Sequence, residues 1–508
     1  MTTSATARFQ AAAPRATDVV RGTASPLTAQ PLTSSAAWHL ARRVCGAPTA
    51  DIVDEITRMG IPAWLSRQLQ PETIDDSRME QYAAECMSLA VRTPAQAFAA
   101  TGGQPWKAGA HAQKLLMTRP VFGNRHLLDS MAEVLGDHVY VPAVGKADSF
   151  SALHEQLIRT HALGRFTDLL HAVMTSPALL IHLDNHQSTK GSPNENLGRE
   201  LLELFTVGTG RFSESDVRNS SLILTGHSFD WAPRMSYRFI PANHHVGRVQ
   251  VMSFSHANSS PTAGPAVLRA YLDYLARHPA TAERLARRIA VRFVSDNPSN
   301  ELVQQMAKAY LGNNTAIVAM LEVLFSAAEF WNSSGHKWRR PMEVFNTVLR
   351  ASRPRVFDPK CRALPEAYNR GPHGWHLEVL GHLPRHAVSI TGHPDHAPAW
   401  NTTSTNLTMW NQLLHWCVNA NAEFGGQPDW GRALNINVGD RALDAMRRAT
   451  WQLTGYQWPA ADIAKIATVL RPARPDGLTE ATTIDRPMAD QLGATVRLIF
   501  SSPYGFLR

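Results

Sequence analysis

The chain of 508 residues is long enough for one large domain or for two to three ordinary ones, and 44% of its residues are hydrophobic. No apolar run approaches the roughly 20 residues that cross a bilayer, so we expect no membrane-spanning helix. The net charge of +8 comes from scattered basic residues rather than from a basic stripe, which argues against a nucleic-acid-binding protein.

The first 35 residues are rich in Ala, Thr, Ser and Pro and lack the apolar centre of a secretory signal. We therefore expect a disordered lead over residues 1–35 and a cytoplasmic protein. The cysteines contain no C-x-x-C pair, which predicts free thiols rather than a disulfide framework or a cysteine zinc site. These cysteines are Cys45, Cys86, Cys361 and Cys417.

Helical periodicity dominates the rest of the chain. Segments such as RFTDLLHAVMTSPALLIHLDN and TAIVAMLEVLFSAAEFWN place apolar residues three and four apart. The best strand pattern is SYRFIPANHHVGRVQVMSF, which predicts a short hairpin carrying His244 and His245. From about Val356 to Asn406 the pattern weakens into an irregular segment rich in Pro, Gly and His, and such long loops are often functional. We predict a mainly α protein, with one large multi-helical domain over residues 36–508 and few short strands.

The stretch NENLGRELLELFTVG, which begins at Asn194, predicts a helix. Ser192 is a suitable N-cap, and Gly208 is a suitable C-terminal glycine. Ser213 then predicts the N-cap of a second helix that ends at Gly226. The two helices would form a hairpin turned by GTGRF.

Helical geometry gathers the charged groups of this first helix on one arc and its leucines on the other. Glu195, Arg199 and Glu203 form a ladder at four-residue spacing. Glu200 and Glu203 stand three residues apart, a spacing that can offer two carboxylates to one metal ion or one proton transfer. The arc fits either a solvated face or a polar network in a cleft, where Arg199 would orient the carboxylates or an anionic substrate group.

Several segments resemble one bacterial family. NENLGRELLELFTVG, followed by FSESDVRNSSLILTGHSFDW, resembles the signature of the family called domain of unknown function 1800. AAWHLARRVCGAPT, LARRIAVRFVSDNP, HKWRRPMEVFNTVLRA and LIFSSPYGFLR follow in the family's order, so the resemblance covers most of Ala36 to Arg508. The chain departs from the signature at Gly198, Phe205 and His227, where the family usually has Ala, His and Trp.

The resemblance implies a large, mostly helical protein. It also implies a partner, because such proteins are frequently encoded beside a phosphatase/sulfatase-like protein of the family called domain of unknown function 1501. It implies no established activity and no catalytic assignment. The polar residues that match just upstream of the signature include Asp184, Asn185 and Gln187, which we expect to border the same surface.

The irregular segment GPHGWHLEVLGHLPRHAVSITGHPDHAPAW holds six of the 22 histidines. His393, Asp395 and His396 place three donors within four residues, and imidazole binds divalent transition metals well. Their spacing matches neither the H-E-x-x-H motif nor a zinc finger. These residues are either a metal site or ordinary loop side chains.

A second candidate metal centre combines carboxylates and histidines from different segments. Glu200 and Glu203 would bind a divalent transition metal with His138 and His227, provided that folding brings the four side chains together.

Two functions compete at this point. The first is an enzyme, either a hydrolase or an oxidoreductase with metal assistance, whose carboxylate/Arg/His pocket acts on a small or medium-sized organic substrate. In that enzyme Glu200 or Glu203 would be the base or a ligand. The second is a non-catalytic scaffold or maturation partner of the phosphatase/sulfatase-like companion. Arg339 and Arg340 would either bind an anion or anchor a helix start.

Overall fold

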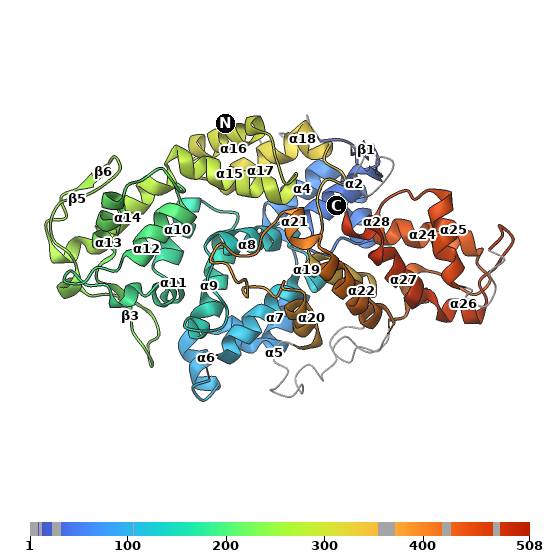
Figure 1. Ribbon diagram of the computed structural model, residues 1–508, viewed down its shortest axis with the longest axis horizontal. Coiled ribbons are helices and arrows are strands. Elements are labelled where there is room, and N and C mark those ends of the chain that lie inside the picture. The colour runs from blue at the N-terminus through green and yellow to red at the C-terminus, as the bar shows by residue number, and fades with distance from the viewer. Residues whose placement is uncertain are drawn as a thin grey trace.

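The computed structural model describes Phe9 and residues 13–22, 32–104, 106–353, 371–418, 428–470 and 478–508. Within these residues the protein is mainly α-helical, as predicted, and its strands form only short antiparallel pairs (Figure 1). No helix among them combines the length and the apolar character that crossing a membrane requires.

The larger of two main hydrophobic cores lies among helices from the first two thirds of the chain. These helices are α2 (Ala36–Val44), α3 (Ala50–Met59), α4 (Ile61–Gln68), α8 (His126–His138), α9 (Asp148–His161), α10 (Phe166–Met174), α11 (Pro177–His182), α12 (Glu195–Glu200), α13 (Glu214–Leu224), α14 (Gly264–Ala276), α15 (Pro279–Phe293), α16 (Asn300–Gly312), α17 (Ile317–Ser326) and α18 (Ala328–Trp331).

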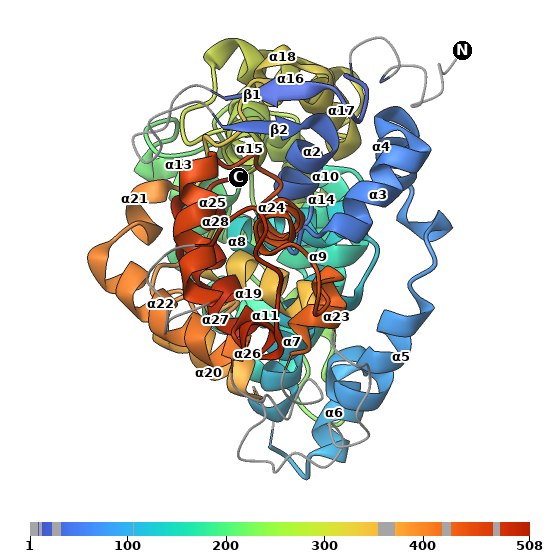
Figure 2. The ribbon, with the colours of Figure 1, turned by 90° about the vertical axis from the view of Figure 1, so that its right-hand side faces the viewer.

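The smaller core lies among the C-terminal helices and the end of α7 (Trp106–Phe122), which contributes Met117 and Val121. Its helices are α19 (Pro341–Ala351), α20 (Gly371–Val379), α21 (Ala397–Trp400), α22 (Thr403–Val418), α23 (Trp430–Leu434), α24 (Ala442–Thr454), α25 (Ala460–Ala467), α26 (Arg486–Asp490), α27 (Leu492–Ser501) and α28 (Pro503–Phe506). Helices α5 (Ser77–Cys86) and α6 (Pro94–Ala100) lie at the edge of the molecule, beside α7 and α9 (Figures 1 and 2).

The strands correct two predictions. β1 (Val19–Arg21) pairs with β2 (Thr33–Ser35), so part of the predicted disordered lead is ordered and packs against α2. The predicted hairpin is wrong in its pairing, because β4 (Tyr237–Phe239) pairs back with β3 (His227–Phe229) and β5 (Val249–Val251) pairs with β6 (Phe254–His256). His244 and His245 lie in the loop between these pairs.

Two further expectations need correction. The segment predicted to be irregular contains α20 and α21 and the start of α22, and its residues 354–370 lie outside the described chain. Cys86 is disulfide-bonded, whereas Cys45 and Cys417 are buried free thiols, so the expectation of thiols alone is wrong for Cys86. Cys361 lies outside the described residues.

The signature stretch is helical but not one regular α-helix. Asn194, not Ser192, is the N-cap of α12, and its side chain accepts a hydrogen bond from Asn196 N. After Glu200 the helix widens into the π-helical turn η4 (Leu201–Phe205), where the Thr206 hydroxyl donates to Leu201 O. The second helix, α13, begins as predicted with Ser213 as its N-cap, and Ser213 forms a capping box with Asp216. Widened turns of this kind often occur at functional sites.

A buried ionic network joins the two cores. The Glu343 carboxylate of α19 accepts from Arg292 of α15, from Arg340 at 3.2 Å and from Arg508 at 2.7 Å. Glu133 of α8 lies 2.8 Å from Arg340 and 3.3 Å from Arg292. Helices α8 and α15 belong to the larger core and α19 to the smaller one, so these ion pairs hold the two halves in register.

Burial opposes the ionisation of Glu343, but the charges of Arg292, Arg508 and Arg340 hold its pKa well below its usual value. A buried ion network is not itself a strong source of stability, because desolvation offsets most of the Coulombic gain. Removing one member is different, since the remaining charges then stay buried without compensation.

We expect Glu343→Gln to lower the free energy of unfolding by about 3–5 kcal/mol, since three arginines lose their shared carboxylate. Urea unfolding followed by circular dichroism measures this change. Glu301→Gln is the matched control, because Glu301 is exposed on α16 and should change stability by no more than about 0.5 kcal/mol. Equal unfolding midpoints for the two variants would contradict the role given to Glu343.

Buried histidines predict acid sensitivity. Burial, with nearby arginines, holds the pKa values of His39, His126 and His138 well below 6.5. The unfolded chain takes up protons near pH 6.5 while these folded imidazoles stay neutral, so their stabilising contribution is complete above that pH and decreases below it. From pH 7.5 to 5.5 each histidine should cost about 1.4 kcal/mol.

The variant His138→Gln isolates one of these contributions, because the glutamine amide can still donate a hydrogen bond. Urea unfolding at the two pH values should show a smaller loss of stability in the variant than in the wild type, by about 1.4 kcal/mol. The same loss in both proteins would show that His138 does not titrate as proposed.

Candidate functional site

A cleft of about 570 Å³ lies where the two cores meet. Its walls come from the end of α8, from one face of α15, from Arg340 before α19 and from the loop 391–396. Large concave sites between substructures are the usual places for ligands. The cleft is the candidate functional site.

The α15 wall carries a ladder of like charges. Arg284, Arg288 and Arg292 stand at i, i+4 and i+8, so they share one face of the helix and line the cleft together. Like charges at this spacing repel one another unless anions lie between or beside them. Arg287 also lines the cleft but already has partners, Asn300 at 2.9 Å and Glu283 at 3.6 Å.

The three arginines of the ladder differ in their partners. Arg292 is buried and neutralised by the network around Glu343. Arg288 donates only to backbone carbonyls, from Nε to Val134 O at 3.3 Å and from Nη2 to Thr391 O at 3.4 Å. Arg284 donates from Nε to Leu204 O at 3.2 Å.

Among the described residues, Arg284 and Arg288 have no carboxylate within 4 Å. Burial lowers the pKa of both groups, with Glu203 acting in the opposite direction on Arg284 and Asp137 on Arg288. A guanidinium nevertheless stays charged at neutral pH. The carbonyls fix both side chains and leave their remaining N–H groups available to an anion.

The loop 391–396 in the cleft wall, and the segment just before it, are fixed at several points. Arg385 binds Glu155 at 2.6 Å and Asp137 at 3.0 Å. Gly392 has φ +76° and passes so close to α8 that a Cβ there would lie 2.7 Å from Asp137 Cβ. His393 donates from Nε2 to Leu383 O at 2.8 Å. The loop is therefore a fixed wall of the cleft.

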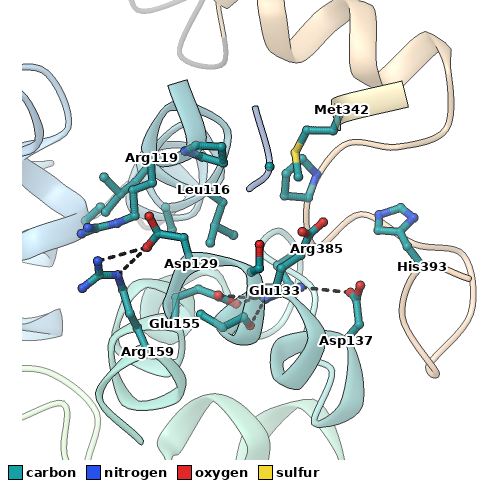
Figure 3. Close-up of a pocket in the computed structure, with 18 of the residues that line it drawn as sticks. Leu116, Arg119, Asp129, Glu133, Asp137, Glu155, Arg159, Met342, Arg385 and His393 are labelled. Carbon is teal, nitrogen blue, oxygen red and sulfur yellow. Dashed lines mark hydrogen bonds and ion pairs between the residues drawn. The ribbon is translucent and has the colours of Figure 1, made fainter. Parts of the chain in front are cut away.

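Behind this wall lies a smaller, partly open chamber of about 70 Å³ (Figure 3). Each of its carboxylates has an arginine partner, and the pairs are Asp129–Arg159, Glu133–Arg340, Asp137–Arg385, Glu155–Arg385 and Glu343–Arg340. The volume accommodates about two water molecules. Asp137 and His393 line both the chamber and the cleft, so they form the partition between the two. On the chamber side the carboxylates are paired with arginines, and on the cleft side Arg284 and Arg288 have no carboxylate partner among the described residues.

The residues predicted to be catalytic lie outside the cleft. Arg199 pairs with Glu214 at 2.6 Å and with Glu195 at 3.8 Å, near the surface. Glu200 is half-buried, and burial together with Glu203 raises its pKa. Glu203 accepts a hydrogen bond from Thr209 and influences the cleft only through its charge near Arg284.

The polar residues upstream of the signature have partners within the fold. Asn185 is buried and donates to Leu224 O and His227 O, which fixes the turn between α11 and α12. Asp184 pairs with Lys146 at 2.9 Å. Gln187 is exposed and lies 3.2 Å from the His186 ring.

The first predicted metal set does not converge. His138 lines the cleft and donates from Nε2 to Phe205 O. His227 is buried beside Tyr237, with 2.7 Å between Nδ1 and the hydroxyl. In the described residues no group of three or more His, Cys, Asp and Glu side chains is arranged to hold a metal ion.

The second predicted set lies at the cleft but not as a cluster of ligands. His393, Asp395 and His396 all line the cleft. Asp395 is bound to Lys337 at 3.1 Å and to Arg508 at 3.4 Å, and these cations hold its pKa low despite burial. His396 is exposed.

In the sequence the arginines of α15 form a local basic cluster, which we took only as evidence against the basic stripe of a nucleic-acid-binding protein. Their spacing at i, i+4 and i+8 was the signal that could have identified a cationic face. Arg339 and Arg340 precede α19 as predicted for a helix anchor, and both are buried. Arg340 also lines the cleft, where it pairs with Glu133 and Glu343.

Two of the three departures from the signature, Gly198 and Phe205, can be placed in the local structure. Gly198 faces α13, where a Cβ would lie 2.6 Å from the Ser221 hydroxyl, so the closely packed pair of helices requires a small residue. Phe205 is buried in the larger core, and its carbonyl rather than its side chain contacts His138.

Comparison with known proteins supports the family resemblance. The model of the family described as "Protein of unknown function (DUF1800)" matches residues 39–506. No curated protein and no solved structure matches the chain. Since the family model spans nearly the whole sequence, the chain belongs to the DUF1800 family.

Proposed function

We propose that this protein is an enzyme that binds a small organic anion in the cleft between its two cores. The observation that carries the proposal is the pair of half-buried guanidinium groups, Arg284 and Arg288, which line the cleft without a carboxylate partner in the described chain. Guanidinium groups favour carboxylate, phosphate and sulfate groups. The substrate therefore carries at least one such group.

The site has the features of a prepared anion receptor. Backbone carbonyls hold both guanidinium groups, so little side-chain entropy is lost when an anion binds. The positive charges of the ladder also attract anions toward the cleft.

The chemical step would fall to groups beside the bound anion. Of the three histidines that line the cleft, His138 and His393 are buried and donate to carbonyls, whereas His396 is exposed to the ligand space. An imidazole that a bound substrate can reach is suited to general acid–base catalysis. We assign that role to His396, which replaces the earlier assignment of base to Glu200 or Glu203.

The binding part of the proposal is tested by calorimetric titration with sulfate, phosphate and a set of small carboxylic acids and phosphate esters. Wild-type protein should bind one or more of these anions. Arg288→Gln should lose about tenfold or more in affinity, since a hydrogen bond to a charged group is worth roughly 1.5–3 kcal/mol. The matched control is Arg269→Gln, an exposed arginine on α14, which should bind like the wild type.

A stability measurement accompanies this titration. Without ligand, Arg288→Gln should be at least as stable as the wild type, because it removes a partly desolvated charge that has no anion partner. A protein that binds none of the anions, or an Arg288→Gln variant that binds them as the wild type does, would contradict the proposal.

A further inference from the structure

Asp137 is the acidic residue with the strongest electrostatic effect on Arg288, but its carboxylate pairs with Arg385 instead. Burial lowers the pKa of Arg288, and Asp137 is the acidic group that most strongly opposes this effect. Yet the Asp137 carboxylate lies 3.0 Å from Arg385 Nη1, on the chamber side of the partition. Arg288 thus has an acidic neighbour that does not neutralise it.

Arg385 is firmly placed for this contact. Its guanidinium binds both oxygens of Glu155, at 2.6 Å from Nε and 3.1 Å from Nη2. It lies directly over α8 at Gly136, where a Cβ would come within 1.7 Å of Nη2, so only glycine admits it. In Figure 3 the Arg385 side chain lies between Glu155 and Asp137.

Asp137 also has access to the other side. It is near the end of α8 and lines the cleft as well as the chamber, so a rotation of its short side chain would direct the carboxylate toward Arg288. An internal carboxylate on Arg288 would compete with any anionic ligand for the same N–H groups.

We propose that Arg385 is a positioning residue for the anion site. By holding Asp137 on the chamber side, it prevents this carboxylate from pairing with Arg288 and keeps that guanidinium available to the substrate. This inference rests on the proposed function, because it concerns the same cleft.

The test is a double-mutant cycle with sulfate as the probe. Arg385→Gln should reduce sulfate affinity by about tenfold, although Arg284 and Arg288 are unchanged, because Asp137 becomes an internal competitor. Adding Asp137→Asn to this variant should restore affinity to within about twofold of the wild type, since the amide carries no negative charge. Asp137→Asn alone should bind sulfate more tightly than the wild type, because it removes a negative charge near Arg288.

Rescue separates positioning from a general structural effect. If the double variant is folded, with a wild-type circular dichroism spectrum, and still binds weakly, the loss in Arg385→Gln comes from distortion and the inference is wrong. Wild-type affinity in Arg385→Gln also overturns it. Should Arg385→Gln fail to fold, Arg385→Lys replaces it in the test. The lysine still places a positive charge beside Asp137, so this variant should retain most of the sulfate affinity. A tenfold loss of affinity in Arg385→Lys that Asp137→Asn does not rescue would contradict the inference.

The proposed function can fail separately. If wild-type protein and Arg288→Gln bind sulfate equally, or if neither binds it, the anion site itself is wrong and the inference about Arg385 falls with it. If the wild type binds, Arg288→Gln does not, and Arg385→Gln matches the wild type, the anion site stands and only the role of Arg385 is refuted.

Discussion

The fold depends on one carboxylate, that of Glu343, which lies buried among Arg292, Arg340 and Arg508. It connects α15 of the larger core with α19 of the smaller one and with the C-terminal segment. These three arginines lie in the segments LARRIAVRFVSDNP, HKWRRPMEVFNTVLRA and LIFSSPYGFLR, which are far apart in the chain and all resemble the family pattern. Three segments that match the family pattern outside the signature therefore supply the arginines of one ionic junction between the two cores.

The junction determines what α15 presents to solvent. At one end of the ladder Arg292 forms ion pairs with Glu343 and Glu133, and these pairs fix the rotation of α15 about its axis. The same rotation places Arg284 and Arg288 in the cleft wall. Carbonyls of the signature turn η4 take part as well, since Leu204 O accepts from Arg284 and Phe205 O from His138. The signature helix supports the cleft by its backbone rather than by its charged side chains.

Much of the fold follows from local rules that a sequence expresses directly. The helical periodicity and the N-cap at Ser213 predict elements that the structure contains. The π-helical turn after Glu200, the strand pair before α2 and the helices within the predicted irregular segment were missed, because tertiary contacts decide them. Thr206 illustrates this point, since its hydroxyl donates to Leu201 O, five residues earlier, whereas Thr57 in the regular helix α3 donates to the carbonyl four residues earlier.

The candidate site was harder to predict than the fold. The segment holding His393, Asp395 and His396 does border the cleft, but the metal chemistry expected there depended on which neighbours folding supplied, and these are lysine and arginine. In the charged arc of the signature helix, Arg199 pairs with Glu195 and with Glu214, and Glu203 accepts a hydrogen bond from Thr209. Whether an arginine has a carboxylate partner depends on residues far away in the sequence. The partners of Arg292, Glu343 and Glu133, are 51 and 159 positions away, and periodicity carries no information about such partners.

The most direct measurement is an anomalous difference map from crystals of the protein soaked in selenate, a heavier analogue of sulfate. The account predicts an anomalous peak in the cleft with selenate oxygens at about 3 Å from the guanidinium nitrogens of Arg284 and Arg288. Selenate bound only at exposed surface arginines, with the cleft free of it, would contradict the central claim that these two unmatched cations form the ligand site.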